Sequence, residues 1–364
     1  MATHTVADGQ AALLEIALLL ARDAPPQTVF AAVAEEGARR FGVDGASVLR
    51  YLGDERAVVV GFWRPGGARG LPVNAEIDFD TRNSAMGRIR QTRRPERADS
   101  YEGQRGELPV LLKAFAIRAT VATPILVGEE LWGAIVVSTG GEEPFPAGAE
   151  HRLGDLAELA ASAVAREQER DALAASRLRI VEAADDARRR LERELHEGTQ
   201  QHLLALTLKL RVALSRAEPG SDVAGLVDDA LVEAMTANAE LRDLARAVFP
   251  IVLSERGLAA ALQAVTARAS VAVHLQELPR RRFPPLAEAT AYFVVAEALA
   301  VADRGPVEIA VADRGELLLV EVGHEGVDGG DERLRALLER VVAVGGRVQI
   351  DRNAVLRAEV PTDR

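Results

Sequence analysis

ArgArgArgLeuGluArgGluLeuHisGluGlyThrGlnGlnHisLeu, residues 188–203, is the stretch that decides the fold, and it continues as LeuAlaLeuThrLeuLysLeu to residue 210. Its apolar positions recur at intervals of three, four or eight residues: Leu191, Leu195, Leu203, Leu206 and Leu210. This spacing predicts one amphipathic helix with a buried stripe. His196 lies beside that stripe and not within it.

The polar side chains next to the stripe are of the types that phosphoryl transfer requires. The imidazole of His196 has a reference pKa of about 6.5, so its nucleophilic nitrogen is available near neutral pH. Glu197 can orient the ring, and Gln201 lies one helical turn beyond Glu197 on the same face. Such a group can accept a phosphoryl group or position a water that removes one. The alternative is a solvated Glu and Gln beside a partly exposed His.

The segment LeuHisGluGlyThrGlnGln, residues 195–201, with its basic and acidic lead-in, resembles the phosphoacceptor box of two-component sensor histidine kinases of the nitrate-sensor class. The resemblance implies that His196 is phosphorylated, that Glu197 is its acid/base partner, and that Gln201 positions water for dephosphorylation of the partner. It also implies a response regulator receiver domain as that partner, within a two-component phosphorelay.

Length, charge and composition exclude several classes of protein. A chain of 364 residues predicts two or three domains. The net charge of −11 argues against nucleic-acid binding, and the absence of cysteine excludes disulfides and thiol catalysis. The best membrane-helix candidate, residues 11–21, is short and broken by Glu15, and the start lacks a signal-peptide pattern. We therefore expect a cytoplasmic protein without a membrane span.

Residues 11–165 predict an α/β sensor domain. Helices are expected at 11–21 and 28–41, strands at 46–51 and 57–63, and a hairpin at 120–138, before an exit helix at 149–165. The hairpin ProIleLeuValGlyGluGluLeuTrpGlyAlaIleValVal and the helix after it resemble the end of a GAF domain. That resemblance implies an antiparallel sheet with helices on one face, and a small-molecule or protein-interaction sensor.

The ligand of this sensor domain is not identified by the sequence. His4 and His151 are its only histidines, which argues against a histidine-ligated haem, and a thioether-linked bilin would need a cysteine. Four aromatic residues could line a pocket, but we interpret them as core residues: Phe62, Trp63, Phe79 and Trp132.

The central region predicts a helical stalk and a helical hairpin. Leu173, Ile180 and Ala187 are seven residues apart, a short coiled-coil pattern that favours a parallel dimer over a solvated linker. Pro and Gly break the helix at 218–222, where Asp222 can cap the second helix, which extends to Pro250. Two helices with one apolar stripe each cannot bury both stripes alone, so we expect a homodimeric four-helix bundle.

Residues 251–364 predict a mixed α/β domain, with helices beginning at 253 and 287 and a hairpin at 307–322 that turns at AspArgGly, residues 313–315. The order of elements resembles the ATP-binding module of the same kinases, a GHKL-like α/β sandwich.

The nucleotide-binding residues of that module are largely replaced. The helix that carries Glu297 has Val301 where the family has an Asn that binds Mg²⁺, and valine cannot coordinate this ion. The Asp-x-Gly-x-Gly motif is replaced by a segment beginning at His324, in which only Gly326 matches. The glycine lid is replaced by ArgLeuArgAlaLeuLeu, residues 333–338. Each lost contact commonly costs about 1.5–3 kcal/mol, so we expect ATP affinity to fall by orders of magnitude.

The predicted fold class is multidomain α+β: a GAF-type sensor, a dimeric helical hairpin and a GHKL-like domain. The expected boundaries are a tail at 1–10, the sensor at 11–165, a signalling helix at 166–187, the hairpin at 188–250 and a degenerate ATPase-like domain at 251–364. Three functions remain: an active histidine kinase, a pseudokinase acting as phosphatase, phosphotransfer partner or scaffold, and a ligand-gated dimer without phosphoryl chemistry. No metal site or tightly bound cofactor is expected, and Glu297 and Gly326 are the remnant of the ATP site.

Overall fold

A computed structural model describes residues 6–65, 71–80, 82–104, 106–194, 198–219, 221–303, 305–323, 332–351 and 355–363. The chain forms two compact units, residues 1–171 and 172–364. Within the described ranges, no helix combines the length and the apolar character that crossing a bilayer requires.

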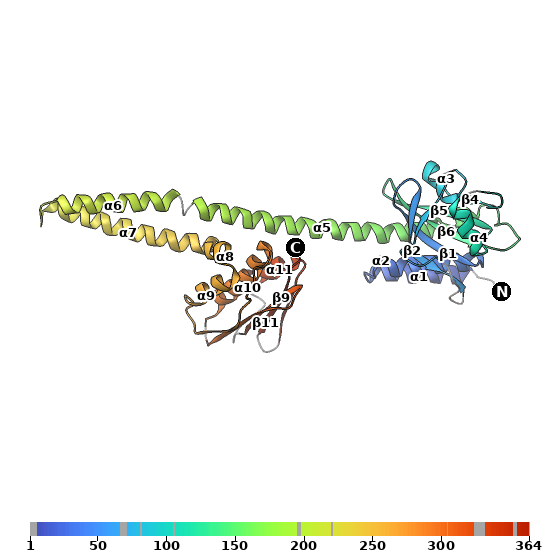
Figure 1. The fold of residues 1–364 in the computed structure, drawn as a ribbon. Helices are drawn as coiled ribbons and strands as arrows, with labels where there is room; N and C mark the ends of the chain where they lie inside the picture. The colour runs from blue at the N-terminus through green and yellow to red at the C-terminus, as the bar shows by residue number, and fades with distance from the viewer. Residues whose placement is uncertain are drawn as a thin grey trace. The chain divides into compact units, whose positions relative to one another are not determined.

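The first unit, drawn in blue to green in Figure 1, is built on a six-stranded antiparallel sheet. The order of its strands is β3-β2-β1-β6-β5-β4. Its strands are β1 Gly45–Tyr51, β2 Arg56–Trp63, β3 Glu76–Asp78, β4 Glu96–Ala98, β5 Ala119–Val127 and β6 Glu130–Thr139. The predicted strands and the β5–β6 hairpin are confirmed. Gly128 has φ +61° in the hairpin turn, a conformation that glycine adopts without strain.

Helices cover both faces of this sheet, so the expectation of helices on one face is wrong. One face carries α1 Val6–Ala21, α2 Pro26–Phe41, the 3₁₀ turn η2 Ala149–Leu153 and the first turns of α5 Gly154–Glu194. The other face carries α3 Ala85–Thr92 and α4 Glu107–Ala114. The reason lies in β5, where every residue from 119 to 125 is buried. Successive side chains point to opposite faces, so such a strand needs cover on both sides.

The central helices follow the predicted pattern with one interruption. α5 is unbroken for 41 residues up to Glu194, and Gly198 and Thr199 form a π-helical turn before α6 Gln200–Arg216. The break at 218–222 is confirmed, and α7 Asp222–Val248 follows it. The cap differs from the prediction, because the Ser221 hydroxyl, and not Asp222, accepts the N–H of Ala224 at 3.2 Å.

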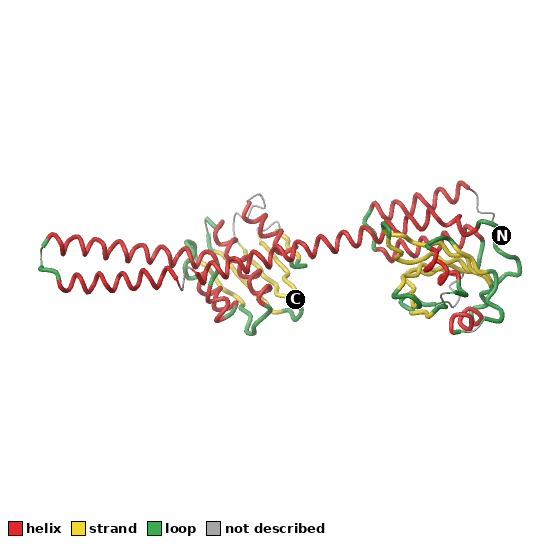
Figure 2. The backbone as a smooth tube through the Cα atoms, turned by 90° about the horizontal axis from the view of Figure 1, so that it is seen from above, coloured by secondary structure: helices red, strands yellow, loops and turns green. Residues whose placement is uncertain are grey.

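α6 and α7 lie side by side as an antiparallel hairpin (Figures 1 and 2). The side of α6 that faces α7 carries Leu203, Thr207 and Leu210, which are half-buried. Leu231, Ala234 and Asn238 of α7 are buried. No α6 side chain is fully buried, so most of this helix remains open to solvent.

The second unit ends in a five-stranded mixed sheet with the order β10-β11-β9-β8-β7. Its strands are β7 Val273–Glu277, β8 Val307–Asp313, β9 Leu317–Gly323, β10 Arg347–Ile350 and β11 Val355–Pro361, and only the β7–β8 pair is parallel. Four helices accompany it: α8 Ile251–Arg256, α9 Leu258–Thr266, α10 Pro285–Val301 and α11 Glu332–Ala343. The last three pack on one face of the sheet and form its core.

Glycine and turn chemistry set two details of this sheet domain. The helix expected to begin at 253 is two short helices, because Gly257 between them has φ +82°, which a right-handed helix cannot contain. The predicted β8–β9 turn is confirmed: the Asp313 carboxylate accepts the N–H of Gly315 at 2.9 Å, which stabilises the tight connection.

Candidate functional site

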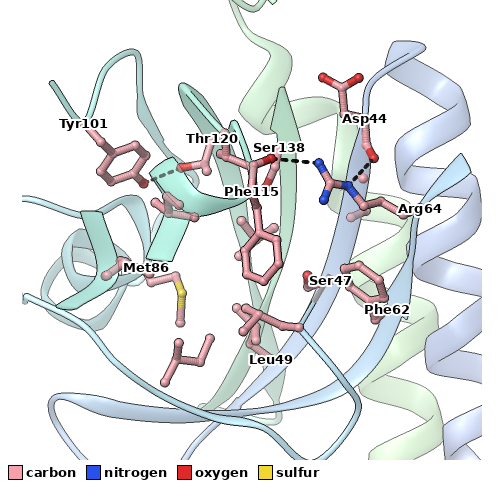
Figure 3. A pocket seen from close by; sticks show the side chains of 18 residues that line it. Asp44, Ser47, Leu49, Phe62, Arg64, Met86, Tyr101, Phe115, Thr120 and Ser138 are labelled. Carbon is pink, nitrogen blue, oxygen red and sulfur yellow. Dashed lines mark hydrogen bonds between the residues drawn. The ribbon is translucent and has the colours of Figure 1, made fainter. Parts of the chain in front are cut away.

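A small cavity lies between the first sheet and helices α3 and α4 (Figure 3). Its volume is about 60 Å³. Its walls are mostly apolar and come from β1, β2, β6, α3, α4 and the segment after α4: Leu49, Phe62, Met86, Leu108, Phe115 and Val136. A water needs roughly 10–15 Å³ of such space, so the cavity holds a few waters or a small ligand group.

Tyr101 and Thr120 provide a buried hydrogen bond at one wall of the cavity. Their hydroxyl oxygens are 2.6 Å apart, and both side chains are buried. Burial raises the pKa of the Tyr101 phenol because the phenolate would lose hydration there, although the Thr120 hydrogen bond acts in the opposite direction. The phenol therefore stays protonated at neutral pH and can donate a hydrogen bond.

Arg64 lies at the opposite wall, as Figure 3 shows. Its guanidinium donates to the backbone carbonyls of Asp44 at 3.2 Å and Phe115 at 2.9 Å. The carboxylate of Asp44 accepts the N–H of Gly140 at 2.8 Å. Gly140 approaches the carbonyl of Ala116 so closely that a Cβ would lie 2.2 Å from its oxygen. These contacts fix a positive charge and a carboxylate at the edge of an apolar space.

Ser47 and Ser138 add hydroxyl groups to the cavity wall. Within the part of the chain that the structure describes, neither side chain has a hydrogen-bond partner. Free hydroxyls beside an apolar surface, with a fixed guanidinium nearby, can orient a small ligand that carries one or two polar atoms.

The four aromatic residues that could line a pocket by sequence lie in different parts of the GAF domain. Phe62 lines the cavity, whereas Phe79 is buried against Tyr51 with ring centroids 5.7 Å apart. Trp63 and Trp132 pack against the core on the other face of the sheet. Nothing in the sequence pointed to Arg64, Tyr101 and Thr120, because they come from separate segments and share no motif.

The predicted phosphoacceptor group is only partly described by the structure. His196 and Glu197 lie outside the described residues. Gln201 lies in the first turn of α6 and is exposed. Its amide is therefore accessible from solvent, on the helix that begins directly after the π-helical turn.

The residues predicted to be the remnant of an ATP site are also described only in part. Gly326 and His324 lie outside the described residues. Glu297 and Val301 belong to the last two turns of α10 and are half-buried, and Val301 packs against the core of the sheet domain. Glu297 borders a groove between α5, α10 and α11 with a volume of about 720 Å³.

Comparison with known proteins identifies the first unit. Residues 25–164 match the GAF domain family. The GAF-B domain of DevS from Mycobacterium smegmatis is 26% identical, with a TM-score of 0.31 over 40% of this chain and 98% of that one. A phycoerythrobilin-bound GAF domain from a cyanobacterial phytochrome is 14% identical, with a TM-score of 0.38 over 45% of this chain and 97% of that one.

A curated relative has a signalling function. The sensor histidine kinase MctS of Rhizobium johnstonii is 36% identical over 88 residues. The match covers 24% of this chain and 19% of the length of MctS. The similarity is thus distant and partial, and it fits a signalling role. Over residues 25–164 the GAF resemblance seen in the sequence is confirmed, and this part of the chain is a GAF domain.

Proposed function

We propose that this protein is a two-component signalling protein of the sensor histidine kinase family, in which the GAF domain controls a dimeric helical hairpin. In this proposal His196 accepts a phosphoryl group, Glu197 is its acid/base partner and Gln201 positions water. The partner is the receiver domain of a response regulator. The same proposal includes the nitrate-sensor class and a GHKL-like fold for residues 251–364. It also includes the domain boundaries at residues 166, 188 and 251.

The observation that carries the proposal is the apolar surface of the α6–α7 hairpin. α6 already faces α7 with Leu203 and Leu210, yet Leu204 and Leu208 on another side are 59% and 65% exposed. Further exposed apolar side chains lie along both helices: Leu206, Val212, Val223, Leu226, Val232 and Met235. A helix that is apolar on several sides is normally buried. A second copy of the hairpin would bury these side chains and complete a four-helix bundle.

The chemistry of the site follows from its residue types. A neutral imidazole is a nucleophile for a phosphoryl group, and a neighbouring carboxylate can hold its other nitrogen in the required tautomer. An amide one turn further along the helix can hydrogen-bond an attacking water. The exposure of Gln201 supports this role, because the water must be positioned at an aspartyl phosphate of another protein.

The composition of α10 supports weak nucleotide binding. At the position where the related kinases have a metal-binding Asn, Val301 presents a hydrocarbon side chain that packs against the core. A methyl group offers no lone pair to Mg²⁺. We therefore favour regulator dephosphorylation or phosphotransfer over autophosphorylation as the activity of the full chain.

The GAF cavity supports a sensor that takes a small ligand. A volume of about 60 Å³ admits a compact molecule or one group of a larger one. Arg64 and the hydroxyls of Ser47 and Ser138 would recognise its polar atoms.

Two measurements test the proposal. The full-length protein is titrated with ATP, with and without magnesium, and is incubated with γ-³²P-ATP. We expect weak binding that magnesium does not strengthen, and no label on His196. Tight Mg-ATP binding with label lost in His196→Ala would make the chain an active kinase.

The second measurement follows the decay of receiver domains phosphorylated with acetyl phosphate. We expect the protein to shorten the lifetime of at least one phosphorylated receiver, and Gln201→Ala to remove this effect. Gln200→Ala is the matched control, because its amide is half-buried on the side of α6 that faces α7. A receiver that binds equally well to both variants, with an unchanged lifetime, would instead indicate a scaffold without phosphoryl chemistry.

A further inference from the structure

The second half of α5 presents two different faces. Leu178 and Val181 pack against the core of the C-terminal sheet domain, and Asp185 on the same face is only 1% exposed. Leu173, Ile180 and Leu191 form another face and are exposed. Residues of an α-helix advance by about 100° each, so Asp185 lies roughly 140° around the helix from Ile180. The helix can therefore contact the sheet domain and a second copy of itself at the same time.

The contact with the sheet domain centres on an ion pair between Asp185 and Arg340 of α11. Arg340 Nη1 donates to Asp185 Oδ1 at 2.8 Å, and Arg340 Nη2 donates to the other carboxylate oxygen. The two residues are 155 positions apart in the sequence, and the Arg340 side chain is only 10% exposed. Such a bidentate arrangement fixes the relative orientation of the two partners as well as their distance.

Aromatic and polar groups of α10 hold the arginine in place. Arg340 Nε donates to the hydroxyl of Thr290 at 3.3 Å, and its guanidinium lies 4.8 Å from the ring centroid of Phe293. Arg188 of α5 lies 5.0 Å from the same ring and donates to Asp185 at 3.4 Å. The two arginines thus join α5 to α10 and α11 around one carboxylate.

A buried ion pair contributes less net stability than a hydrophobic contact of similar size. Both charges regain full hydration when the helix and the domain separate, so a buried ion pair contributes little net stability even where its geometry is demanding. The accompanying apolar contact is small, because Leu178 and Val181 are only partly buried. A rotation of α5 by a single residue step would move Asp185 about 100° away from Arg340. The contact therefore requires one orientation of α5, and breaking it costs little free energy.

We propose that Asp185 and Arg340 form an intramolecular latch that holds the C-terminal sheet domain on α5 and is released when that helix rotates. Through the latch, the rotation of α5, which begins in the GAF domain, determines whether the sheet domain is held on the helix or can move away from it. The latch does not depend on whether His196 is phosphorylated, so its failure would leave the proposed function untouched.

The test measures the distance between α5 and α11 in the full-length chain. The protein has no cysteine, so spin labels can be attached cleanly at Ala183→Cys and Arg335→Cys, two exposed positions. Labelled chains are mixed with an excess of unlabelled protein, so that only distances within one chain are recorded. We expect one narrow distance distribution, which Asp185→Ala broadens and shifts to longer distances.

The matched control is Asp186→Ala. Asp186 is exposed and pairs only with Arg189 of its own helix among the described residues. The control should keep the narrow distribution. Amide exchange of α10 verifies that the sheet domain stays folded, and Asp185→Asn, which keeps the side-chain volume, replaces the alanine variant if α10 is affected. An unchanged distribution in the Asp185 variant, or equal broadening in the Asp186 control, would overturn the latch.

Discussion

Arg282 and Glu288 form an ion pair whose two partners differ sharply in exposure. Arg282 Nε lies 2.9 Å from Glu288 Oε1, but the Glu288 side chain is 2% exposed and that of Arg282 is 55% exposed. Glu288 also accepts the backbone N–H of Phe283 at 3.1 Å. The carboxylate therefore fixes the loop before α10 from inside the C-terminal domain, while the guanidinium covers it from solvent.

We expect Arg282→Ala to destabilise the C-terminal sheet domain by about 2–3 kcal/mol, because it leaves a buried carboxylate without its cation. This is below the cost of breaking a fully buried pair, since water can partly replace Arg282. The control is Arg281→Ala, whose pair with Asp313 is exposed to solvent and therefore contributes little to the stability of the domain. Urea denaturation followed by hydrogen exchange of α10 amides gives both values. Equal losses in the two variants would show that Glu288 is adequately solvated without Arg282.

A second prediction concerns the contact between β2 and α2 in the GAF domain. A Cβ at Gly61 would lie 2.7 Å from the backbone and the Cβ of Phe30. Gly61→Ala must therefore push α2 away from the sheet, and overpacking of this kind costs about 1–3 kcal/mol. Gly53→Ala is the control, because nothing lies within 4 Å of its added Cβ. Both tryptophans, Trp63 and Trp132, belong to this domain, so denaturation followed by tryptophan fluorescence reports on it alone. Similar midpoints for the two variants would contradict the prediction.

Local patterns in the sequence predicted most elements of the fold. The β-rich segments of β1, β2, β5 and β6 and the heptad spacing of α5 are visible within short windows. The interruption of the helix at Gly257 was missed, because a single glycine is compatible with a helix until its φ is known. The two-sided cover of the first sheet was also missed, since α3 and α4 are short and weakly patterned.

The contacts that join distant segments could not be predicted. Asp185 and Arg340 each look like one charge in a charged run, and only the tertiary fold brings them together. The cavity has the same origin: Arg64, Tyr101 and Thr120 line one space because β2, β5 and the loop before α4 converge. The motif around His196 was legible because its residues are close in sequence.

A third prediction addresses the hairpin surface. Leu204→Glu with Leu208→Glu places two carboxylates on the exposed apolar side of α6. If a second copy covers this side, burying those charges is prohibitive, and the dimer should dissociate to monomer. Lys209→Glu, an exposed position on the same helix, changes the charge without touching an apolar side chain and should remain dimeric.

Sedimentation equilibrium of the full-length chain measures the oligomeric state, and circular dichroism verifies that the helices persist. Dimers in the double variant, with unchanged affinity, would mean that another surface carries the association.

A fourth prediction concerns pH. The hydrogen bond from Arg281, together with the N–H of Gly315, lowers the pKa of Asp313 below its ordinary value. A carboxyl whose pKa is lower in the folded state stabilises the fold above its unfolded pKa. That contribution is lost as the pH falls through the folded pKa, here below about pH 4.

Arg281→Met should therefore raise the pKa of Asp313 toward the ordinary value, as measured by NMR titration of its carboxyl carbon. It should leave the pKa of Asp80 low, because that carboxylate is stabilised mainly by the N–H of Arg82. An Asp313 pKa that does not move would mean that the turn N–H alone holds it down.

The last prediction uses the cavity wall of the GAF domain. Thr120→Val keeps the shape of the side chain but removes the 2.6 Å hydrogen bond to the buried Tyr101 hydroxyl, which should cost about 1–3 kcal/mol. Ser138→Ala removes a hydroxyl that has no hydrogen-bond partner among the described residues, so it should cost less than about 0.5 kcal/mol. Denaturation followed by tryptophan fluorescence compares the two. A large loss of unfolding free energy in Ser138→Ala would mean that this hydroxyl already stabilises the fold and is not available to a ligand. A small loss would agree with a hydroxyl that is available to hydrogen-bond a ligand.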